Sequence, residues 1–268
     1  MKKTIITYVF LFLTVCISAQ QLTLNEIFNN GMVLQQKSSA LVWGTAKPTA
    51  NLSIKIQQKI FKSTSLPDGN WTVTLKNLQP GGPFRMSVYA DKDSVVLNEV
   101  YVGEVWIAGG QSNMGWTLEK SDGGKEEIAN AKNTNIRFVM VPAVLYEGDR
   151  TRGDMNWRTA TTENVSQISG VAYYFAKELQ AKLKVPVGIL CCYKGGTAAE
   201  VWMSRETLLQ NPDHAPIVEA YEKYLADLGA AKMEEINATY DKNLKFYFDS
   251  VKAGFANAVR PIEPLGNH

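Results

Sequence analysis

Histidine and cysteine are the residues that this 268-residue sequence has least of. It contains 2 histidines, His214 and His268, and 3 cysteines. A zinc site with four nitrogen or sulfur ligands would need partners that the chain barely has. Cys191 and Cys192 are adjacent, and disulfide geometry strains the peptide between adjacent cysteines. We therefore expect no metal or other cofactor, and two thiols on opposite faces of one strand, at least one of them buried.

An excess of charge of either sign is also missing. Lys and Arg together number 28 and Asp and Glu 26, so the formal net charge is +2. Two of the lysines lie in an N-terminal segment that we expect to be removed, which brings the net charge close to zero. The basic footprint of a nucleic-acid-binding protein is absent, and no nucleic-acid partner is expected. The chain is 45% hydrophobic and 20% charged, so it has material for a sizeable core and is not globally disordered.

The first residues have the pattern of a secretory signal peptide. Two lysines, an apolar run over residues 5–17 and two small residues follow one another. We predict a signal peptide over residues 1–19, cleavage after Ala19, and export to the periplasm or beyond. The apolar run is too short for a comfortable membrane span, so none is expected. The alternative is a lipoprotein anchor at Cys16, which the large Val15 before it disfavours.

The next part of the chain has the pattern of short β-strands. Apolar and polar residues alternate over residues 51–56, with Leu52, Ile54 and Ile56 on one face, and again over residues 71–75. Clusters of proline, glycine and asparagine separate these runs and indicate turns. The spacing predicts a small β-sandwich domain over residues 20–99.

The pattern changes near residue 100. Buried parallel strands are predicted at residues 105–108, 135–141 and 187–192. A helix is predicted at residues 170–183, and its apolar face would consist of Val171, Tyr174, Phe175 and Leu179. Strands that alternate with a helix predict an α/β layer with a mostly parallel sheet. Residues 205–268 are predicted to be a solvated helical insertion and a final loop.

Two glycine-containing turns carry the candidate chemistry. Residues 109–114 (GGQSNM) follow a predicted buried strand, which places Ser112 at the carboxyl edge of a parallel sheet, where ligands bind in open α/β folds. A serine that opens the next helix could offer its own N–H to an oxyanion. Gly195 and Gly196 follow another strand and would bring a backbone N–H to the same crevice. By composition alone, an N-cap serine and an ordinary turn are the better explanations of these residues.

These turns belong to a larger set of segments that resembles the sialate O-acetylesterase family of SGNH hydrolases, which are carbohydrate acetylesterases. The resemblance is carried by residues 28–35 (FNNGMVLQ), 42–44 (VWG), 102–106 (VGEVW), 110–114 (GQSNM), 195–197 (GGT) and 200–204 (EVWMS). It implies a β-domain followed by a flavodoxin-like α/β/α hydrolase domain, of which residues 100–204 would be the N-terminal part. It also implies a carboxylic ester hydrolase that acts on an acetylated carbohydrate.

The resemblance further implies the roles of the residues in the two turns. Ser112 would be the nucleophile that attacks an acetyl ester. Its own N–H and that of Gly196, or of Gly195 as second choice, would form the oxyanion hole. Gln111 and Asn113 would shape the loop.

The sequence departs from the family where the base should be. The family's Gln-Gly-Glu block and Asp-x-x-His block are missing, so we identify no catalytic histidine or aspartate. His214 has the wrong spacing to its neighbouring aspartate and lies between two prolines, and His268 is the last residue. We expect an incomplete reading frame whose product is inactive alone.

Two other functions remain open at this stage. One is an acetylxylan-type polysaccharide esterase, and the other is a non-catalytic carbohydrate-binding or scaffold protein with a dead pocket. The presence of a base separates the enzymes from the binding protein. The identity of the sugar and the oligomeric state cannot be deduced from the sequence.

Overall fold

The structure is a computed structural model that describes residues 21–142, 155–254 and 261. The predicted signal peptide and its cleavage site lie outside these residues. The N-terminal part is built of strands: β1 (Thr23–Leu24), β2 (Val33–Gln35), β3 (Ala40–Thr45), β4 (Asn51–Ile56), β5 (Lys59–Thr64), β6 (Asn70–Leu75) and β7 (Gly81–Ala90). An α/β part follows: β8 (Asp93–Gly110), η1 (Leu118–Lys120), α1 (Gly124–Asn130), β9 (Lys132–Met140), β10 (Arg158–Thr161), α2 (Gly170–Leu183) and β11 (Val187–Tyr193). The last described elements are η2 (Ala199–Trp202), α3 (Arg205–Gln210), α4 (Ala215–Leu228) and α5 (Ala230–Lys252).

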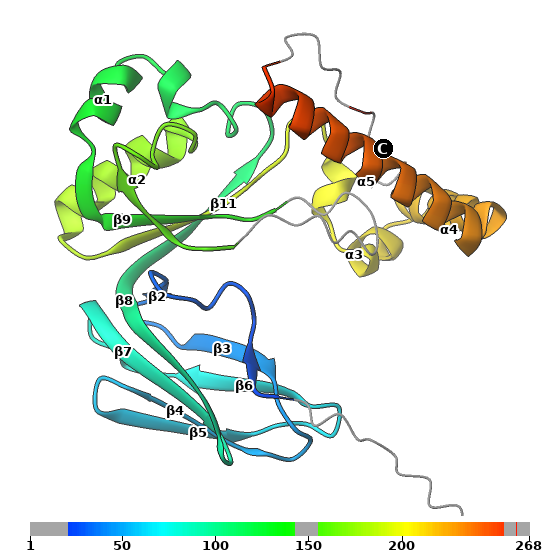
Figure 1. Cartoon of the computed structure of the whole chain (residues 1–268). Helices are drawn as coiled ribbons and strands as arrows, with labels where there is room; N and C mark the ends of the chain where they lie inside the picture. Colours follow the sequence, from blue (N-terminus) through cyan, green and yellow to red (C-terminus); the bar gives the residue numbers. More distant parts are fainter. Residues whose placement is uncertain (1–20, 143–154, 255–260, 262–268) are drawn as a thin grey trace, which may run out of the picture.

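One long strand joins the two parts of the molecule. The 18 residues of β8 run antiparallel to β7 at one end and parallel to β11 at the other. As a result, an eight-stranded sheet in the order β10-β9-β11-β8-β7-β4-β5, with β2 also on β8, passes through both parts (Figure 1). The boundary predicted between residues 99 and 100 falls inside β8.

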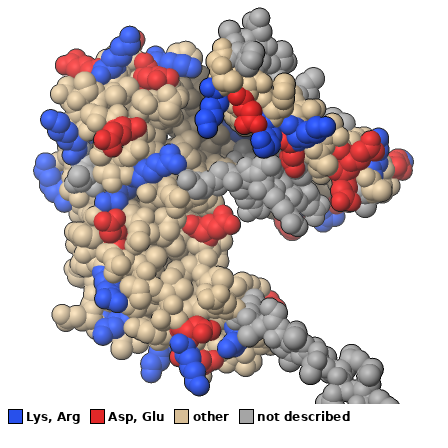
Figure 2. Space-filling view, in the orientation of Figure 1, with Lys and Arg blue, Asp and Glu red and all other residues tan. Residues whose placement is uncertain are grey.

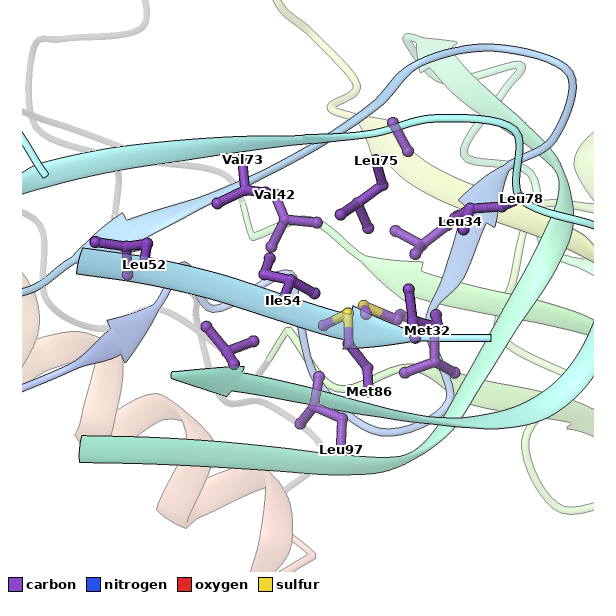
Figure 3. Packing of buried hydrophobic residues seen from close by; sticks show 14 of the residues in the cluster. Met32, Leu34, Val42, Leu52, Ile54, Val73, Leu75, Leu78, Met86 and Leu97 are labelled. Atoms are coloured by element: carbon purple, nitrogen blue, oxygen red, sulfur yellow. The ribbon is translucent and has the colours of Figure 1, made fainter. Parts of the chain in front are cut away.

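The β-part closes its core between this sheet and a second sheet of three strands, β1-β3-β6. Figure 3 shows side chains from both sheets, among them Val42, Ile54 and Met86, pointing toward one another. The predicted face of β4 is confirmed, because Leu52 and Ile54 are buried together with Ile56. Strict alternation on a half-buried strand therefore identified the core-facing side chains correctly.

The α/β part confirms the predicted fold class. Strand β11 pairs in parallel with both β8 and β9, and α2 covers one face of this sheet (Figure 1). Helix α2 has the predicted bounds and begins where the Ser169 hydroxyl accepts a hydrogen bond from the Ala172 N–H at 3.1 Å.

The predicted buried face of α2 was wrong in part, because only Tyr174 and Leu179 of its four residues are partly buried against the core. Ala172, Tyr173 and Ala176 are buried against the sheet, whereas Val171 and Phe175 are exposed. Apolar residues surround most of this helix, so their spacing alone could not select a face. The two alanines can approach the sheet closely because they have no bulk beyond Cβ.

The prediction that residues 105–108 form a buried strand was also wrong in part. Trp106 is 45% exposed and Ile107 72% exposed. In the described part of the chain, residues 104–110 of β8 pair with β11 but with no strand on their other side. The Trp106 ring packs edge-on against Phe175 of α2, at 5.1 Å between centroids. An apolar sheet edge is thus left uncovered by the described residues.

The helices α3, α4 and α5 confirm the predicted helical region after residue 204, and Figure 1 shows them to one side of the sheet. Their exposed pairs, such as Lys223 with Asp227, are typical of a solvated helix. On the side of the molecule shown in Figure 2, positive and negative side chains are interspersed. No helix among the described residues is long and apolar enough to cross a membrane.

Candidate active site

The two predicted turns meet because β8 and β11 are neighbouring parallel strands. Their register pairs Cys192 with Gly109 and Tyr193 with Gly110, so both strands end at the same level. Beyond the strands, the Lys194 N–H donates to the Gly110 carbonyl at 3.0 Å. Gly110 has a φ of 144°, which lets the chain leave β8 in a direction that other residues rarely adopt.

Ser112 lies in an isolated turn, and the expectation that it opens a helix was wrong. The Gly115 N–H donates to the Gln111 carbonyl at 2.9 Å, which closes one helical turn. The chain then continues into η1 instead of an α-helix. The turn still has the property that matters for chemistry: its first N–H groups, including that of Ser112, have no acceptor within the turn.

The hydroxyl of Ser112 lies against the second glycine turn. A Cβ atom built on Gly195 would be only 3.1 Å from the Ser112 Oγ. Gly196 has a φ of 78° and open space at its Cβ position. All three residues are exposed, and no residue described by the structure accepts a hydrogen bond from the N–H of Ser112, Gly195 or Gly196. An accessible hydroxyl therefore lies next to a turn whose N–H groups have no acceptor among the described residues, and an oxyanion site needs such donors.

Hydrogen bonds connect the two turns beside this point. The Gln111 side-chain amide donates to the Thr197 carbonyl. The Thr197 hydroxyl donates to the Lys194 carbonyl at 3.0 Å and accepts from the Trp202 indole N–H at 2.9 Å. Thr197 and Trp202 lie in two of the segments that resemble the family, but no role was predicted for either residue. The sequence feature that could have identified Thr197 is its place directly after the two glycines, as a polar residue in a turn.

Tyr193 and Met140 lie close to the serine turn. The Tyr193 ring lies next to Gly115, and its hydroxyl is 3.9 Å from the Met140 sulfur. Burial raises the pKa of Tyr193 well above its ordinary value. Burial also raises the pKa of Cys191 to about 12, so this thiol is uncharged at neutral pH. Cys191 and Cys192 are both free, and the prediction that at least one of these thiols is buried is confirmed by Cys191.

The described residues supply no base to the serine. The Ser112 hydroxyl has no hydrogen-bond partner in the parts of the chain that the structure describes. His214 lies at the N-terminus of α4, where its backbone N–H donates to the Asn211 carbonyl at 3.0 Å. Its Nδ1 atom is buried without a hydrogen-bond partner in the described structure. His268 lies outside the described residues.

The fold and the site together define a class of protein. An exposed serine on a tight turn at the carboxyl end of a parallel strand, next to a glycine turn whose N–H groups have no described acceptor, is the arrangement of an α/β serine ester hydrolase. Residues 102–243 match the family model described as carbohydrate esterase, sialic acid-specific acetylesterase. This match covers both turns and most of the helical region.

The chain belongs to this family of sialic acid-specific acetylesterases. It is 32% identical over 202 residues to mouse sialate O-acetylesterase, and 29% identical over 200 residues to the human one. Both alignments cover 67% of this chain but only 37% and 38% of those relatives. A solved carbohydrate acetylesterase from Xanthomonas citri matches with a TM-score of 0.65 and 34% identity, over 70% of this chain and 44% of that one.

Proposed function

We propose that this chain carries the nucleophile and most of the oxyanion site of an esterase that removes O-acetyl groups from sialic acid. The observation that carries the proposal is the close approach of Gly195 to the Ser112 Oγ, beside three N–H groups without described partners. The proposed substrate comes from the family model and from the names of the mouse and human relatives.

The proposed reaction proceeds through an acetyl-serine. The Ser112 Oγ forms a bond to the acetyl carbonyl carbon while its proton passes to a base. The carbonyl oxygen becomes an oxyanion, which accepts hydrogen bonds from the N–H of Ser112 and of Gly196 or Gly195. The bond from carbon to the sugar oxygen then breaks, and that oxygen takes the proton. Water releases acetate from Ser112 by the same steps.

We propose that neither His214 nor His268 is the base, and that the base is supplied from outside the 268 residues of this sequence. A serine hydroxyl without a base is a weak nucleophile near neutral pH. Loss of a triad member typically lowers the rate by several powers of ten. The 268-residue chain alone is therefore expected to hydrolyse nitrophenyl acetate or O-acetylated sialic acid barely above background.

The test compares this chain with a version extended through the downstream reading frame. If the extension carries Gln-Gly-Glu and Asp-x-x-His blocks, turnover should rise, and Ser112→Ala should then abolish it. Rapid Ser112-dependent hydrolysis by the 268-residue chain would contradict the proposal about the base. His214→Ala and His268→Ala, made separately, would then identify the residue responsible.

A binding function is the second candidate, because no base lies beside Ser112 among the described residues. A protein with this site but no base would bind an acetylated carbohydrate without cleaving it. If the extended protein binds O-acetylated sialic acid, seen by calorimetry, but releases no acetate, the binding function is correct. Release of acetate from acetylated xylan, but not from sialic acid, would instead favour the polysaccharide esterase.

A further inference from the structure

Thr197 differs from its neighbours in the turn after β11. It is 8% exposed, whereas Gly195, Gly196 and the two residues after it are exposed to solvent. A polar side chain that is buried in an otherwise exposed turn needs partners, because an unpaired buried hydroxyl is costly. The hydrogen-bond partners of Thr197 therefore indicate which parts of the site this residue holds together.

Thr197 makes polar contacts with three different segments. Its hydroxyl donates to the carbonyl of Lys194, at the beginning of the turn, at 3.0 Å. The same hydroxyl accepts from the indole N–H of Trp202, at the end of η2, at 2.9 Å. Its carbonyl accepts from the side chain of Gln111, the residue before Ser112.

These contacts close a frame around the two glycines. On one side, the Lys194 N–H donates to the Gly110 carbonyl at 3.0 Å, which joins the two turns at the strand ends. On the other side, the bond between Gln111 and Thr197 joins them again. Gly195 and Gly196 lie between these two links. Glycine has the widest range of backbone conformations, so without these links the two glycines could adopt other conformations.

We propose that Thr197 is a positioning residue that holds Gly195 and Gly196 against Ser112. The inference rests on the proposed function, because it assigns to this frame the task of fixing the oxyanion donors. The hydroxyl is suited to the task because it donates and accepts at the same time. Valine has nearly the same shape but would leave both the Lys194 carbonyl and the Trp202 N–H without this partner.

Two substitutions separate the hydroxyl from the shape of the side chain. Thr197→Val removes the hydroxyl, and Thr197→Ser keeps it. Trp202→Phe removes one donor to the hydroxyl and serves as a second route if the valine variant folds poorly. Thr72→Val, on an exposed position of β6, controls for the substitution itself.

The first readout is amide hydrogen exchange by NMR in the 268-residue chain, which requires no activity. The Lys194 N–H reports on the frame because its acceptor, Gly110, belongs to the other turn. Loss of one hydrogen bond is expected to speed its exchange about fivefold or more in Thr197→Val, with a smaller effect in Trp202→Phe. Thr197→Ser and Thr72→Val should match the parent, and the Phe138 amide in β9 should be unchanged throughout.

The second readout is catalysis in the extended protein used to test the proposed function. Thr197→Val should lower kcat for nitrophenyl acetate about fivefold or more with little change in KM, and Thr197→Ser should restore it. If Thr197→Val leaves the exchange of Lys194 unchanged, or if Thr197→Ser behaves like Thr197→Val, the inference is wrong. If Ser112→Ala keeps full turnover, the proposed function fails instead, while the exchange of Lys194 still decides whether Thr197 holds the frame.

Discussion

Gly195 and Gly196 are adjacent in the chain, yet an added Cβ atom would have a different consequence at each position. At Gly195, a Cβ would meet the Ser112 Oγ at 3.1 Å, and no left-handed backbone is involved. At Gly196, a Cβ would meet nothing within 4 Å, but the φ of 78° is unfavourable for alanine. Gly195→Ala and Gly196→Ala should therefore have different effects on stability.

The expected magnitudes follow from these two geometries. A left-handed backbone costs an alanine about 1–2 kcal/mol, and restriction of the unfolded chain offsets about 0.4–1 kcal/mol of this, so Gly196→Ala should lower the free energy of unfolding by about 1 kcal/mol. Gly195→Ala crowds only the end of a side chain that can rotate away. It also restricts the unfolded chain, which is worth about 0.4–1 kcal/mol in favour of folding. Its net effect on the free energy of unfolding should therefore be close to zero or slightly positive.

Urea denaturation of the 268-residue chain and of both variants measures this difference. Gly123→Ala is the matched control, because Gly123 has a left-handed backbone with a φ of 69° and its Cβ would make only an ordinary contact, 3.7 Å from the Tyr174 hydroxyl, away from the site. It should lose about as much stability as Gly196→Ala. A larger loss in Gly195→Ala than in Gly196→Ala would refute the reasoning, because the Ser112 hydroxyl would then be unable to move aside.

Three further predictions concern the sheet, a tyrosine and the N-terminus. Gly103→Ala should lower the free energy of unfolding, measured by urea denaturation, by about 3 kcal/mol or more. Its Cβ would lie 1.9 Å from the Pro186 carbonyl oxygen and push β11 away from β8. An unchanged free energy of unfolding would contradict this packing. Burial and the nearby Glu127 raise the pKa of Tyr173 to about 12 from 10.0. The pKa is higher in the folded than in the unfolded protein, so the contribution of Tyr173 to stability should be complete below pH 10 and be lost as the pH rises toward 12. Tyr173→Phe should remove this pH dependence of the free energy of unfolding. Ionisation of Tyr173 near pH 10 in the folded protein would contradict the prediction. The exported protein should begin near Gln20 by mass spectrometry, and a lipid on Cys16 or an intact first methionine would disprove the predicted cleavage.

The local patterns were sufficient to predict most of the elements and the two turns. Alternation identified the buried face of β4, and a helix was predicted over the residues that form α2. Glycines after two apolar runs located the turns that hold Ser112 and Gly195. These features depend on residues close together in the chain, so their physical causes are visible in the sequence.

Tertiary contacts decided the rest. The side of α2 that is buried depends on which residues fit the sheet, and Ala172 and Ala176 do so although larger apolar residues surround them. The joining of both parts by β8 depends on strands that pair from distant parts of the chain. The link from Gln111 through Thr197 to Trp202 exists only because β8 and β11 lie side by side, which brings together residues 86 positions apart. The sequence determined the chemical groups of the site, and the parallel pairing of these two strands determined their geometry.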